Sequence, residues 1–417
     1  MQLTSDDERV LTNLSARGEA LVARAVDWCA INSGSRNLAG LEQQRGALET
    51  VLSRLPGDLE RVPLPPSPEV GANGAPKSQA HTDALRLTVR PGAANQVVLT
   101  GHYDTVYPAE TGFRSVRTRA DGALGGPGIA DMKGGISVML GALETFETHP
   151  LAARVGYVVL LSPDEEIGSP ASAPLLAEAA SRGHIGMTYE PCMPDGALAG
   201  ARKGSGNFHV AVRGRAAHAG RDFASGRNAL AGAAELATLL DALNGRRGGV
   251  TVNIGRIDGG GALNVVPDSA VLRFNIRVPD TAAADWCSSA MREAMARVTA
   301  RDLTVSLHGG FTRPAKPINA AQQRLLESVR SVGALVGQII AWRDSGGVCE
   351  GNNLLAAGLP NVDTLGVRGG DIHSEAEYAW PESFAERARL SAALLMKIAS
   401  GEVDAKAIRA ANTRWHS

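Results

Sequence analysis

Short apolar runs rich in β-branched residues alternate with helical patterns through the first half of the chain. The apolar runs lie at Leu85–Val89, Gln96–Thr100, Val155–Leu161 and Ile185–Tyr189. The helical patterns occupy Asp131–Thr148 and Ser172–Arg182. Strands that alternate with helices in this way indicate an α/β layer with a largely parallel sheet.

The order of predicted elements changes after about Gly200. A strand, a helix, two strands, a helix and a strand are expected at Phe208–Arg213, Arg227–Leu243, Gly249–Ile257, Ala270–Val278, Ala282–Thr299 and Leu303–His308. This βαββαβ order is typical of a compact ferredoxin-like α+β unit. Helical patterns at Ala320–Val336 and Glu382–Ala399 then return to α/β character.

The chain is long enough for two domains, and these patterns predict one inserted in the other. The predicted fold class is α/β, with a mixed, largely parallel sheet plus an inserted ferredoxin-like α+β domain. The expected division is 1–202 and 313–417 for the first domain and 203–312 for the insertion. The segment Pro63–Pro76 is rich in Pro, Gly and Ser without periodicity, so we expect a surface loop there.

Charge and composition exclude several classes of partner. Lys and Arg number 42 and Asp and Glu 43, so no excess charge indicates a nucleic acid or a membrane surface. A small or polar substrate is therefore a better expectation than either of these partners. No apolar run of about 18 residues occurs, so no segment is expected to span a membrane. The N-terminus MQLTSDDERV lacks the features of an export signal, so we expect a cytoplasmic location. The four cysteines form no CxxC pair and predict neither a disulfide framework nor a thiolate zinc site.

Residues able to carry chemistry gather where the predicted strands end. Ligands of open α/β sheets bind beyond the carboxyl ends of the strands. Three strands lead there into the stretches GHYDTV, PDEEIGS and YEP, a glycine-rich turn GGPGIADMKGG opens a helix, and GGDIHSEAE follows far downstream. These stretches hold His102, Asp104, Asp164, Glu165, Glu166, Glu190, Asp131 and His373.

Each of these residues has an ordinary structural explanation when taken alone. A single His near a strand end is usually a surface residue, and Asp131 could be a helix N-cap. Glu165 and Glu166 could form a solvated turn, and Glu190 could simply end its strand. Together, two imidazoles and several carboxylates on the strand ends of one sheet favour a divalent-metal site. Nitrogen and oxygen donors without thiolate suit Zn²⁺, with Co²⁺ or Mn²⁺ as alternatives.

The order of these motifs resembles the di-zinc aminoacylase and carboxypeptidase family, which includes acetylornithine deacetylase, succinyl-diaminopimelate desuccinylase and bacterial glutamate carboxypeptidase. The resemblance covers nearly the whole chain through GHYDTV, GPGIADMKGG, PDEEIGS, YEP, GRAAHAG, NVVP with NIRV, and GGDIHSE. GPGIADMKGG and TVYP are most similar to the glutamate carboxypeptidase branch. The resemblance implies a zinc-peptidase catalytic domain with an inserted dimerisation, or lid, domain.

For the metal site, the resemblance implies two Zn²⁺ ions per chain bridged by Asp131. One ion takes His102 and Glu190, and the other takes Glu166 and His373. A shared carboxylate can hold two cations close together despite their repulsion.

For catalysis, the resemblance implies that Glu165 is the general base, which takes a proton from the attacking water. Asp104 orients His102 by accepting its other ring N–H. His218 in GRAAHAG reaches the active site of a partner subunit and helps to polarise the scissile carbonyl. An isolated histidine in such a loop would otherwise be structural. The chain is therefore expected to form a homodimer through the inserted domain.

For substrate binding, the resemblance implies that Asn264 and Arg277 bind a substrate carboxylate. A guanidinium suits forked recognition of a carboxylate, although a lone arginine on a strand is more often a surface charge. We expect Arg277 to share a face of its strand with Arg273, with Asn275 on the opposite face.

SGGVCEGNN is interpreted as a substrate loop in which main-chain groups of Gly347 contact the substrate. It departs from the family pattern at Val348 and Cys349, where Thr and Ser are expected. That departure leaves the preferred acyl or amino-acid group open.

The predicted function is zinc-dependent hydrolysis of an amide bond next to a free carboxylate, in a small molecule or short peptide. The enzyme would be a glutamate-carboxypeptidase-like exopeptidase or an N-acyl-amino-acid hydrolase. The alternatives are a deacylase of the acetylornithine or diaminopimelate type and an amidohydrolase of an aromatic amine or conjugate. From another class, the chain could be a non-catalytic metal- or ligand-binding relative. Glu165, which metal binding does not need, argues against that reading.

Overall fold

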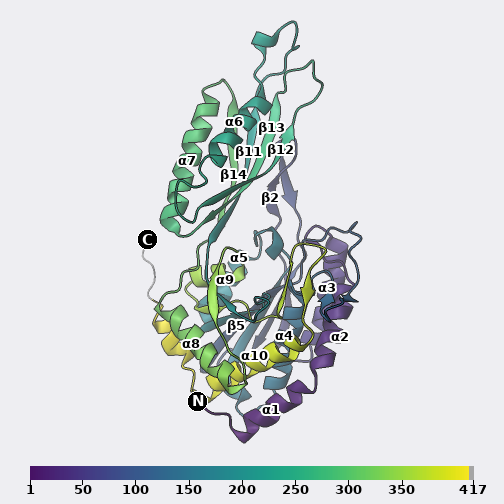
Figure 1. The fold of residues 1–417 in the computed structure, drawn as a ribbon, viewed down its shortest axis with the longest axis vertical. Coiled ribbons are helices and arrows are strands. Elements are labelled where there is room, and N and C mark those ends of the chain that lie inside the picture. Colours follow the sequence, from purple (N-terminus) through teal and green to yellow (C-terminus); the bar gives the residue numbers. More distant parts are fainter. Residues whose placement is uncertain (413–417) are drawn as a thin grey trace.

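A mixed sheet forms the centre of the lower part of the molecule, which we call the α/β domain (Figure 1). The computed structural model describes residues 1–412. In spatial order the strands of this sheet are β1 (Asp58–Val62), β4 (Ala84–Val89), β8 (Val155–Ser162), β5 (Asn95–His102), β9 (Ile185–Thr188) and β16 (Asn361–Val362). The pairs β8–β5, β5–β9 and β9–β16 are parallel, whereas β1–β4 and β4–β8 are antiparallel. The predicted mixed, largely parallel sheet is confirmed.

Helices cover both faces of this sheet, and β5 shows why its sequence reads as one apolar run. Val97 and Leu99 of β5 belong to the core shared with α1 (Ser5–Ser15), α2 (Gly18–Cys29), α3 (Leu38–Leu52), α4 (Lys133–Phe146), α8 (Ala320–Leu335), α10 (Glu382–Ser400) and α11 (Ala405–Ala410). Val98 between them points to the other face, toward α5 (Ala173–Arg182) and α9 (Glu350–Ala356). A strand buried on both faces has no polar side to alternate with.

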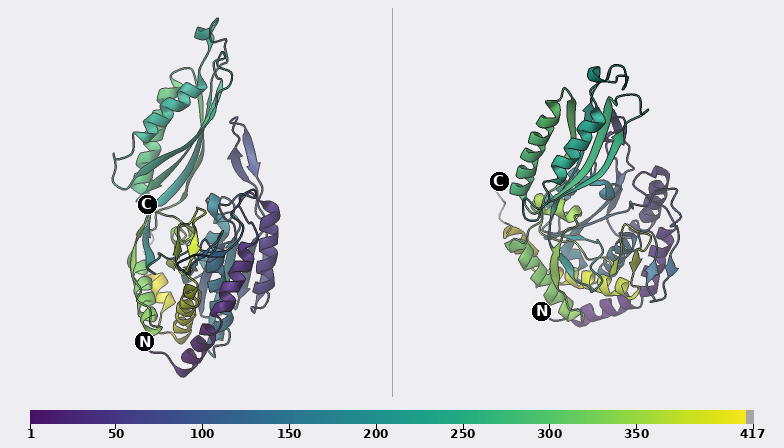
Figure 2. Two further views of the ribbon diagram at one scale, coloured as in Figure 1. Left: turned by 45° about the vertical axis from the view of Figure 1, so that its right-hand side comes forward. Right: turned by 45° about the horizontal axis from the view of Figure 1, so that its top comes forward.

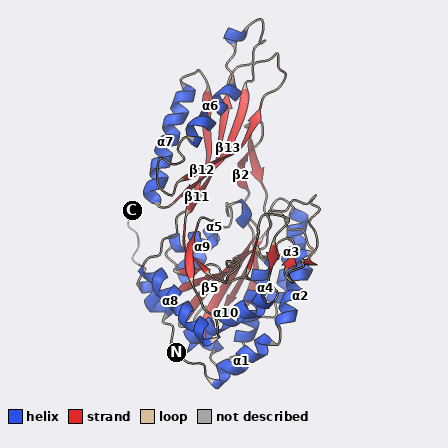
Figure 3. Ribbon diagram, viewed as in Figure 1, coloured by secondary structure: helices blue, strands red, loops and turns tan. Residues whose placement is uncertain are grey.

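The upper part, which we call the inserted domain, is a four-stranded antiparallel sheet with two helices on one face (Figure 3). Its strands in spatial order are β12 (Thr251–Gly259), β13 (Ser269–Val278), β11 (Gly204–Arg213) and β14 (Thr304–Arg313). Its helices are α6 (Ala229–Asp241) and α7 (Thr281–Thr299). Alternate residues such as Phe208, Val210 and Val212 face these helices and form a second core. The predicted βαββαβ order is confirmed.

A hairpin replaces the surface loop that the sequence predicted at Pro63–Pro76, so that prediction is wrong. β2 (Ser67–Val70) pairs with β3 (Pro76–Gln79) and extends toward the open face of the inserted sheet (Figure 2). Arg273 donates to the Val70 carbonyl at 2.9 Å. The hairpin packs on a polar sheet face rather than on a core, so apolar and polar residues hardly alternate along it. The alternation that would have predicted two strands is therefore missing from the sequence.

Short elements complete the α/β domain. They are β6 (Arg117–Thr118), β7 (Leu124–Gly125), β10 (Leu198–Arg202), β15 (Trp342–Ser345), β17 (Gly369–Gly370), β18 (Tyr378–Ala379), and the 3₁₀ turns η1 (Ala152–Arg154) and η2 (Glu165–Ile167); η3 (Phe223–Ser225) lies in the inserted domain. The chain crosses between the domains twice, and the crossings pair: Arg202 and Lys316 exchange backbone hydrogen bonds of 2.8 and 2.9 Å. We call this paired segment, residues 202–205 and 313–316, the neck.

The sequence expectations for the cysteines and for membrane-spanning segments can be compared with the structure. The four cysteines, Cys29, Cys192, Cys287 and Cys349, are all free and buried. Among the residues described, no helix has the length and apolar character needed to cross a membrane.

Candidate active site

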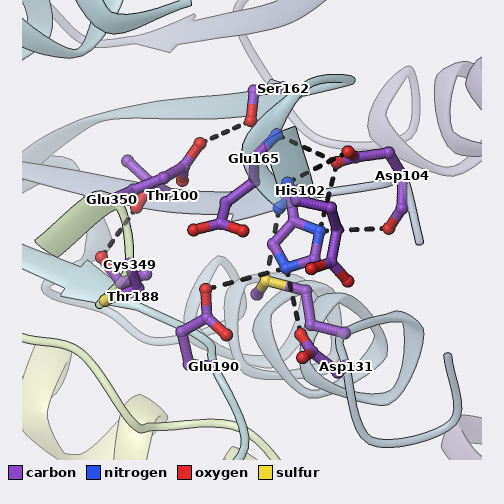
Figure 4. Close-up of polar contacts among 12 residues, drawn as sticks. Thr100, His102, Asp104, Asp131, Ser162, Glu165, Thr188, Glu190, Cys349 and Glu350 are labelled. Carbon is purple, nitrogen blue, oxygen red and sulfur yellow. Dashed lines mark hydrogen bonds and ion pairs between the residues drawn. The ribbon is translucent and has the colours of Figure 1, made fainter. Parts of the chain in front are cut away.

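The carboxyl ends of three parallel strands meet at one edge of the α/β sheet. His102 is the last residue of β5 and lies beside Ser162, the last residue of β8. Glu190 follows β9, the other neighbour of β5. Asp131 lies two residues before α4, in the glycine-rich turn. Figure 4 shows His102, Glu190 and Asp131 pointing toward one another.

Two groups of possible metal ligands share Asp131. His102, Asp131 and Glu190 form the first, and Asp131, Glu166 and His373 form the second; the ligand atoms of each group lie within 4.8 Å of one another. His102 Nε2 is 3.1 Å from Asp131 Oδ1 and 3.7 Å from Glu190 Oε1. His373 Nε2 is 3.3 Å from Asp131 Oδ2 and 3.2 Å from Glu166 Oε2. Asp131 therefore presents a different oxygen to each group.

The crowded acids shift the pKa values of the whole cluster. Burial, and then repulsion from Asp131, raises the pKa of Glu166 to about 8 and that of Glu190 well above its usual value. Hydrogen bonds to Asp131 and Glu166 raise the pKa of His373 to about 11. Burial alone would lower the pKa of His102, but its carboxylate neighbours outweigh burial and raise it. Burial and mutual repulsion thus disfavour the ionised form of Glu166 and Glu190, and a bound cation would favour it.

These donors fit a pair of divalent cations. Glu190 Oε1 is buried and has no hydrogen-bond partner within residues 1–412, so it is free for a ligand. The alternative role of Asp131 as a helix cap is wrong, because the N-cap of α4 is Met132 and has no side-chain cap bond. Imidazole nitrogens and carboxylate oxygens without thiolate suit Zn²⁺ and neighbouring transition metals.

Asp104 connects His102 to the turn that follows β8. Its Oδ1 lies 3.3 Å from His102 Nδ1, and its main-chain carbonyl lies 3.1 Å from the same nitrogen. The carboxylate also accepts the backbone N–H groups of Glu165 and Glu166 at 3.2 and 3.1 Å. Ser35 donates to it from the N-terminal segment at 2.7 Å. Asp104 therefore fixes the positions of His102, from the first ligand group, and of Glu166, from the second, relative to each other.

Glu377 supports the glycine-rich turn, and the sequence did not identify it. Its carboxylate accepts the backbone N–H groups of Gly128, Ala130 and Asp131 at 3.1, 2.9 and 3.0 Å. Tyr107 donates to it at 2.6 Å. The only sequence signal is its place four residues after His373. One segment therefore carries both a possible metal ligand and a carboxylate that holds the backbone of Asp131.

The carboxylate of Glu165 lies beside the first ligand group (Figure 4). Arg313, at the end of β14, donates to its Oε1 at 2.6 Å. Glu350 is fully buried nearby, where burial raises its pKa to about 8 and Ser162 donates to it at 2.5 Å. Neither Arg313 nor Glu350 is marked by a local sequence pattern, because each reaches the site only through the tertiary fold.

Arg277 is half-buried on the open face of the inserted sheet, at the end nearest the α/β domain. Its Nη1 is buried and has no partner in the described part of the chain. Burial, then the neighbouring Arg313, lowers its pKa, while the Glu165 carboxylate acts in the opposite direction. The expectation that Asn275 faces the other way is wrong: Arg277 Nε donates to Asn275 Oδ1 at 2.9 Å. Residues two apart on a strand share a face.

His218 and Asn264 lie together at the far end of the inserted domain. The backbone of Ala219 donates to the Asn264 carbonyl at 2.9 Å, and both predicted side chains are exposed. His218 follows the distal end of the ten-residue strand β11, whose other end adjoins the neck. Such a strand spans about 30 Å, so the fold separates these two residues from the ligand groups of the same chain. It also separates Asn264 from Arg277, although the family resemblance implies that both bind the substrate carboxylate.

Gly347 lies in an exposed loop before α9. Its carbonyl accepts from Arg202 Nη1 at 3.2 Å, and the Arg202 Nε donates to the buried carboxylate of Asp363 at 2.8 Å. Cys349 accepts the Gly351 N–H at 3.3 Å and serves as the helix cap. The thiol thus takes a capping role that Ser or Thr usually fills.

A mixed α/β sheet with two groups of possible metal ligands at its strand ends, interrupted by an α+β domain, fits a metal-dependent enzyme. The chain belongs to peptidase family M20/M25/M40, whose model matches residues 98–397. It is a metallopeptidase of this family, with carboxypeptidases among its relatives.

Individual relatives are distant in sequence. Carboxypeptidase G2 from Pseudomonas sp. (strain RS-16) is 26% identical over 321 residues, which cover 75% of this chain and 76% of that protein. Succinyl-diaminopimelate desuccinylase from Verminephrobacter eiseniae is 28% identical over 304 residues, covering 69% and 74%. The structure of a dipeptidase from Saccharomyces cerevisiae superposes with a TM-score of 0.74 at 15% identity, covering 95% and 99%. At 15% identity, the similarity to the yeast dipeptidase shows the fold alone.

Proposed function

We propose that this metallopeptidase hydrolyses an amide bond next to a free carboxylate, as an exopeptidase or an N-acyl-amino-acid hydrolase. The observation that carries the proposal is the meeting of three features at one place. Two ligand groups share Asp131, and the carboxylate of Glu165 lies beside the first of them. The guanidinium of Arg277, whose Nη1 has no partner among residues 1–412, is close enough to Glu165 for its charge to be felt. These are the parts needed to activate water, move its proton and hold an anionic substrate.

Two Zn²⁺ ions would be held by His102 with Glu190 and by His373 with Glu166, with Asp131 bridging. When bound, such ions polarise a carbonyl and lower the pKa of water. Glu165 takes the proton from the attacking water and passes it to the leaving amine. Asp104 holds His102 through its ring N–H and fixes the turn that carries Glu165, so it orients both.

Arg277 binds the carboxylate that lies next to the scissile amide. A buried guanidinium nitrogen without a partner costs stability unless an anion reaches it, and a carboxylate matches its forked geometry. As the family resemblance implies, main-chain groups of the Gly347 loop also contact the substrate. The identity of the acyl or amino-acid group is left open by the substitution of Val348 and Cys349 into this loop.

His218 acts on the active site of a partner subunit, together with Asn264, in a homodimer formed through the inserted domain. Support comes from the length of β11, about 30 Å, which separates both residues from the ligand groups of their own chain. The edge strand β12, with mostly exposed residues, offers a surface for pairing with a second copy. The division into 1–202, 203–312 and 313–417, with 203–312 as the dimerisation domain, stays a prediction.

A second candidate function is deacylation of an N-acyl diamino acid, favoured by the similarity to succinyl-diaminopimelate desuccinylase. A panel of N-acyl amino acids, dipeptides and N-acyl diamino acids, scored by product release, tests both. We expect release from free-acid substrates by the wild type and none by Glu165→Gln. Equal release by wild type and Glu165→Gln would contradict the proposed mechanism, and exclusive release from diamino acids would favour the second candidate.

A further inference from the structure

Arg313 binds Glu165 through more than its carboxylate. The Nη2 of Arg313 donates to Glu165 Oε1 at 2.6 Å, to the Glu165 main-chain carbonyl at 3.0 Å and to Ser169 Oγ at 3.0 Å. Its Nη1 donates to Asn353 Oδ1 of α9 at 2.8 Å. The guanidinium thus hydrogen-bonds to the turn that carries Glu165 and connects this turn to α9, the helix that follows the Gly347 loop.

The backbone of Arg313 is held as firmly as its side chain. It is the last residue of β14 and pairs with Ser205 of β11 in the neck. Asn352 of α9 donates to the carbonyls of Lys203 and Pro314, one on each crossing of the neck, at 2.9 and 2.8 Å. A side chain anchored at such a rigid junction can set the position of the group that it binds.

We propose that Arg313 is a positioning residue for hydrolysis: by holding Oε1 and the main chain of Glu165, it leaves the second carboxylate oxygen directed at the water. This inference rests on the proposed function, in which Glu165 moves the proton. It assigns to the neck of the inserted domain a direct part in the geometry of proton transfer.

The contacts of Arg313 separate this role from direct binding of substrate. Its side chain is 2% exposed, and both terminal nitrogens are occupied by acceptors of the protein itself. Arg277, in contrast, keeps a buried nitrogen that has no partner among the residues the structure describes. Of the two neighbouring guanidiniums, Arg277 is therefore the one free to bind an anion, and Arg313 acts through Glu165.

The test is steady-state kinetics of Arg313→Lys and Arg313→Gln on the best substrate of the wild type. Misplacing a reacting group by about 1 Å costs on the order of 100-fold in rate. We expect Arg313→Gln to lower kcat by about that factor with KM changed less than about threefold. Arg313→Lys should recover part of kcat, because an ammonium can still reach Oε1 but cannot bind Ser169 and Asn353 as well. Arg182→Gln, which removes an exposed ion pair on α5, is the matched control and should be unchanged.

A double-mutant cycle with Glu165→Asp isolates the coupling. The shorter carboxylate no longer meets Arg313 as the wild type does, so adding Arg313→Gln to it should cost several-fold less than in the wild type. A higher KM with unchanged kcat in the Arg313 variants, or equal costs in both backgrounds, would overturn the proposal. If Arg313→Gln does not fold, Arg313→Lys decides alone, and unchanged kcat there would overturn it. A wild type inactive on every substrate would instead refute the proposed function.

Discussion

Replacing Arg277 by Ala is expected to remove the preference for substrates with a free carboxylate beside the scissile amide. In the structure, Arg277 Nε donates to Asn275, and its Nη1 is buried without a partner within residues 1–412. A bound carboxylate would satisfy that nitrogen with a charge-assisted bond. The same carboxylate converted to an amide would lose the charge and leave the guanidinium poorly paired.

Losing one partner of a buried, hydrogen-bonded charge pair costs about 2–5 kcal/mol. This corresponds to roughly 30-fold to several thousand-fold in kcat/KM between a free-acid substrate and its amide. The ratio should fall close to one in Arg277→Ala, because neither substrate then meets a guanidinium. Arg277→Lys should not restore it, since an ammonium lacks the planar fork.

The assay measures kcat/KM for a matched acid and amide in the wild type, Arg277→Ala and Arg277→Lys. Arg61→Gln, which alters an exposed arginine on β1 of the α/β domain, serves as the control. A wild type that cleaves acid and amide equally well would refute carboxylate recognition by Arg277. The enzyme would then be reassigned toward the deacylase or general amidohydrolase alternatives.

Three further predictions concern the metals, the assembly and the packing of the N-terminus. A chelator should abolish activity, and Zn²⁺ or Co²⁺ should restore it. Asp131→Ala should lower activity more than a change of any other ligand, because Asp131 belongs to both groups. Activity that survives metal removal would contradict this prediction. Mixing inactive His218→Ala and Glu165→Gln chains should recover part of the activity in heterodimers, whereas full activity of a verified monomer would refute action across subunits. Asp7→Asn should lower the free energy of unfolding by about 1–3 kcal/mol near neutral pH, because buried Asp7 accepts from Lys397 at 3.0 Å. Burial raises the pKa of Asp7, but Thr4 and Lys397 outweigh it and lower that pKa, so the difference from wild type in denaturant titrations should shrink as pH falls below about 4. A difference independent of pH would contradict this assignment.

The sequence located the strand-end residues because parallel neighbours carry their ends to one edge of a sheet. His102 and Glu190 follow adjacent strands, so proximity could be predicted from the pattern alone. His373 lies far along the chain, and its pairing with Glu166 in a second ligand group follows from the resemblance alone. Arg313 and Glu377 carry no local pattern, because their partners become neighbours only when distant segments fold together.

The remaining errors have equally physical causes. The hairpin β2–β3 packs on a polar face and therefore shows no apolar alternation. Asn275 was placed on the wrong face, although a period of two puts it beside Arg277. Asn264 and Arg277 are close in sequence, but β13 carries them to opposite ends of the inserted domain.

The most direct test of the central claim is anomalous diffraction from crystals of the active protein, recorded on both sides of the zinc absorption edge. We expect two anomalous peaks, one between Asp131, His102 and Glu190 and the other between Asp131, Glu166 and His373. Crystals of demonstrably active protein with no anomalous metal peak at Asp131 would contradict it.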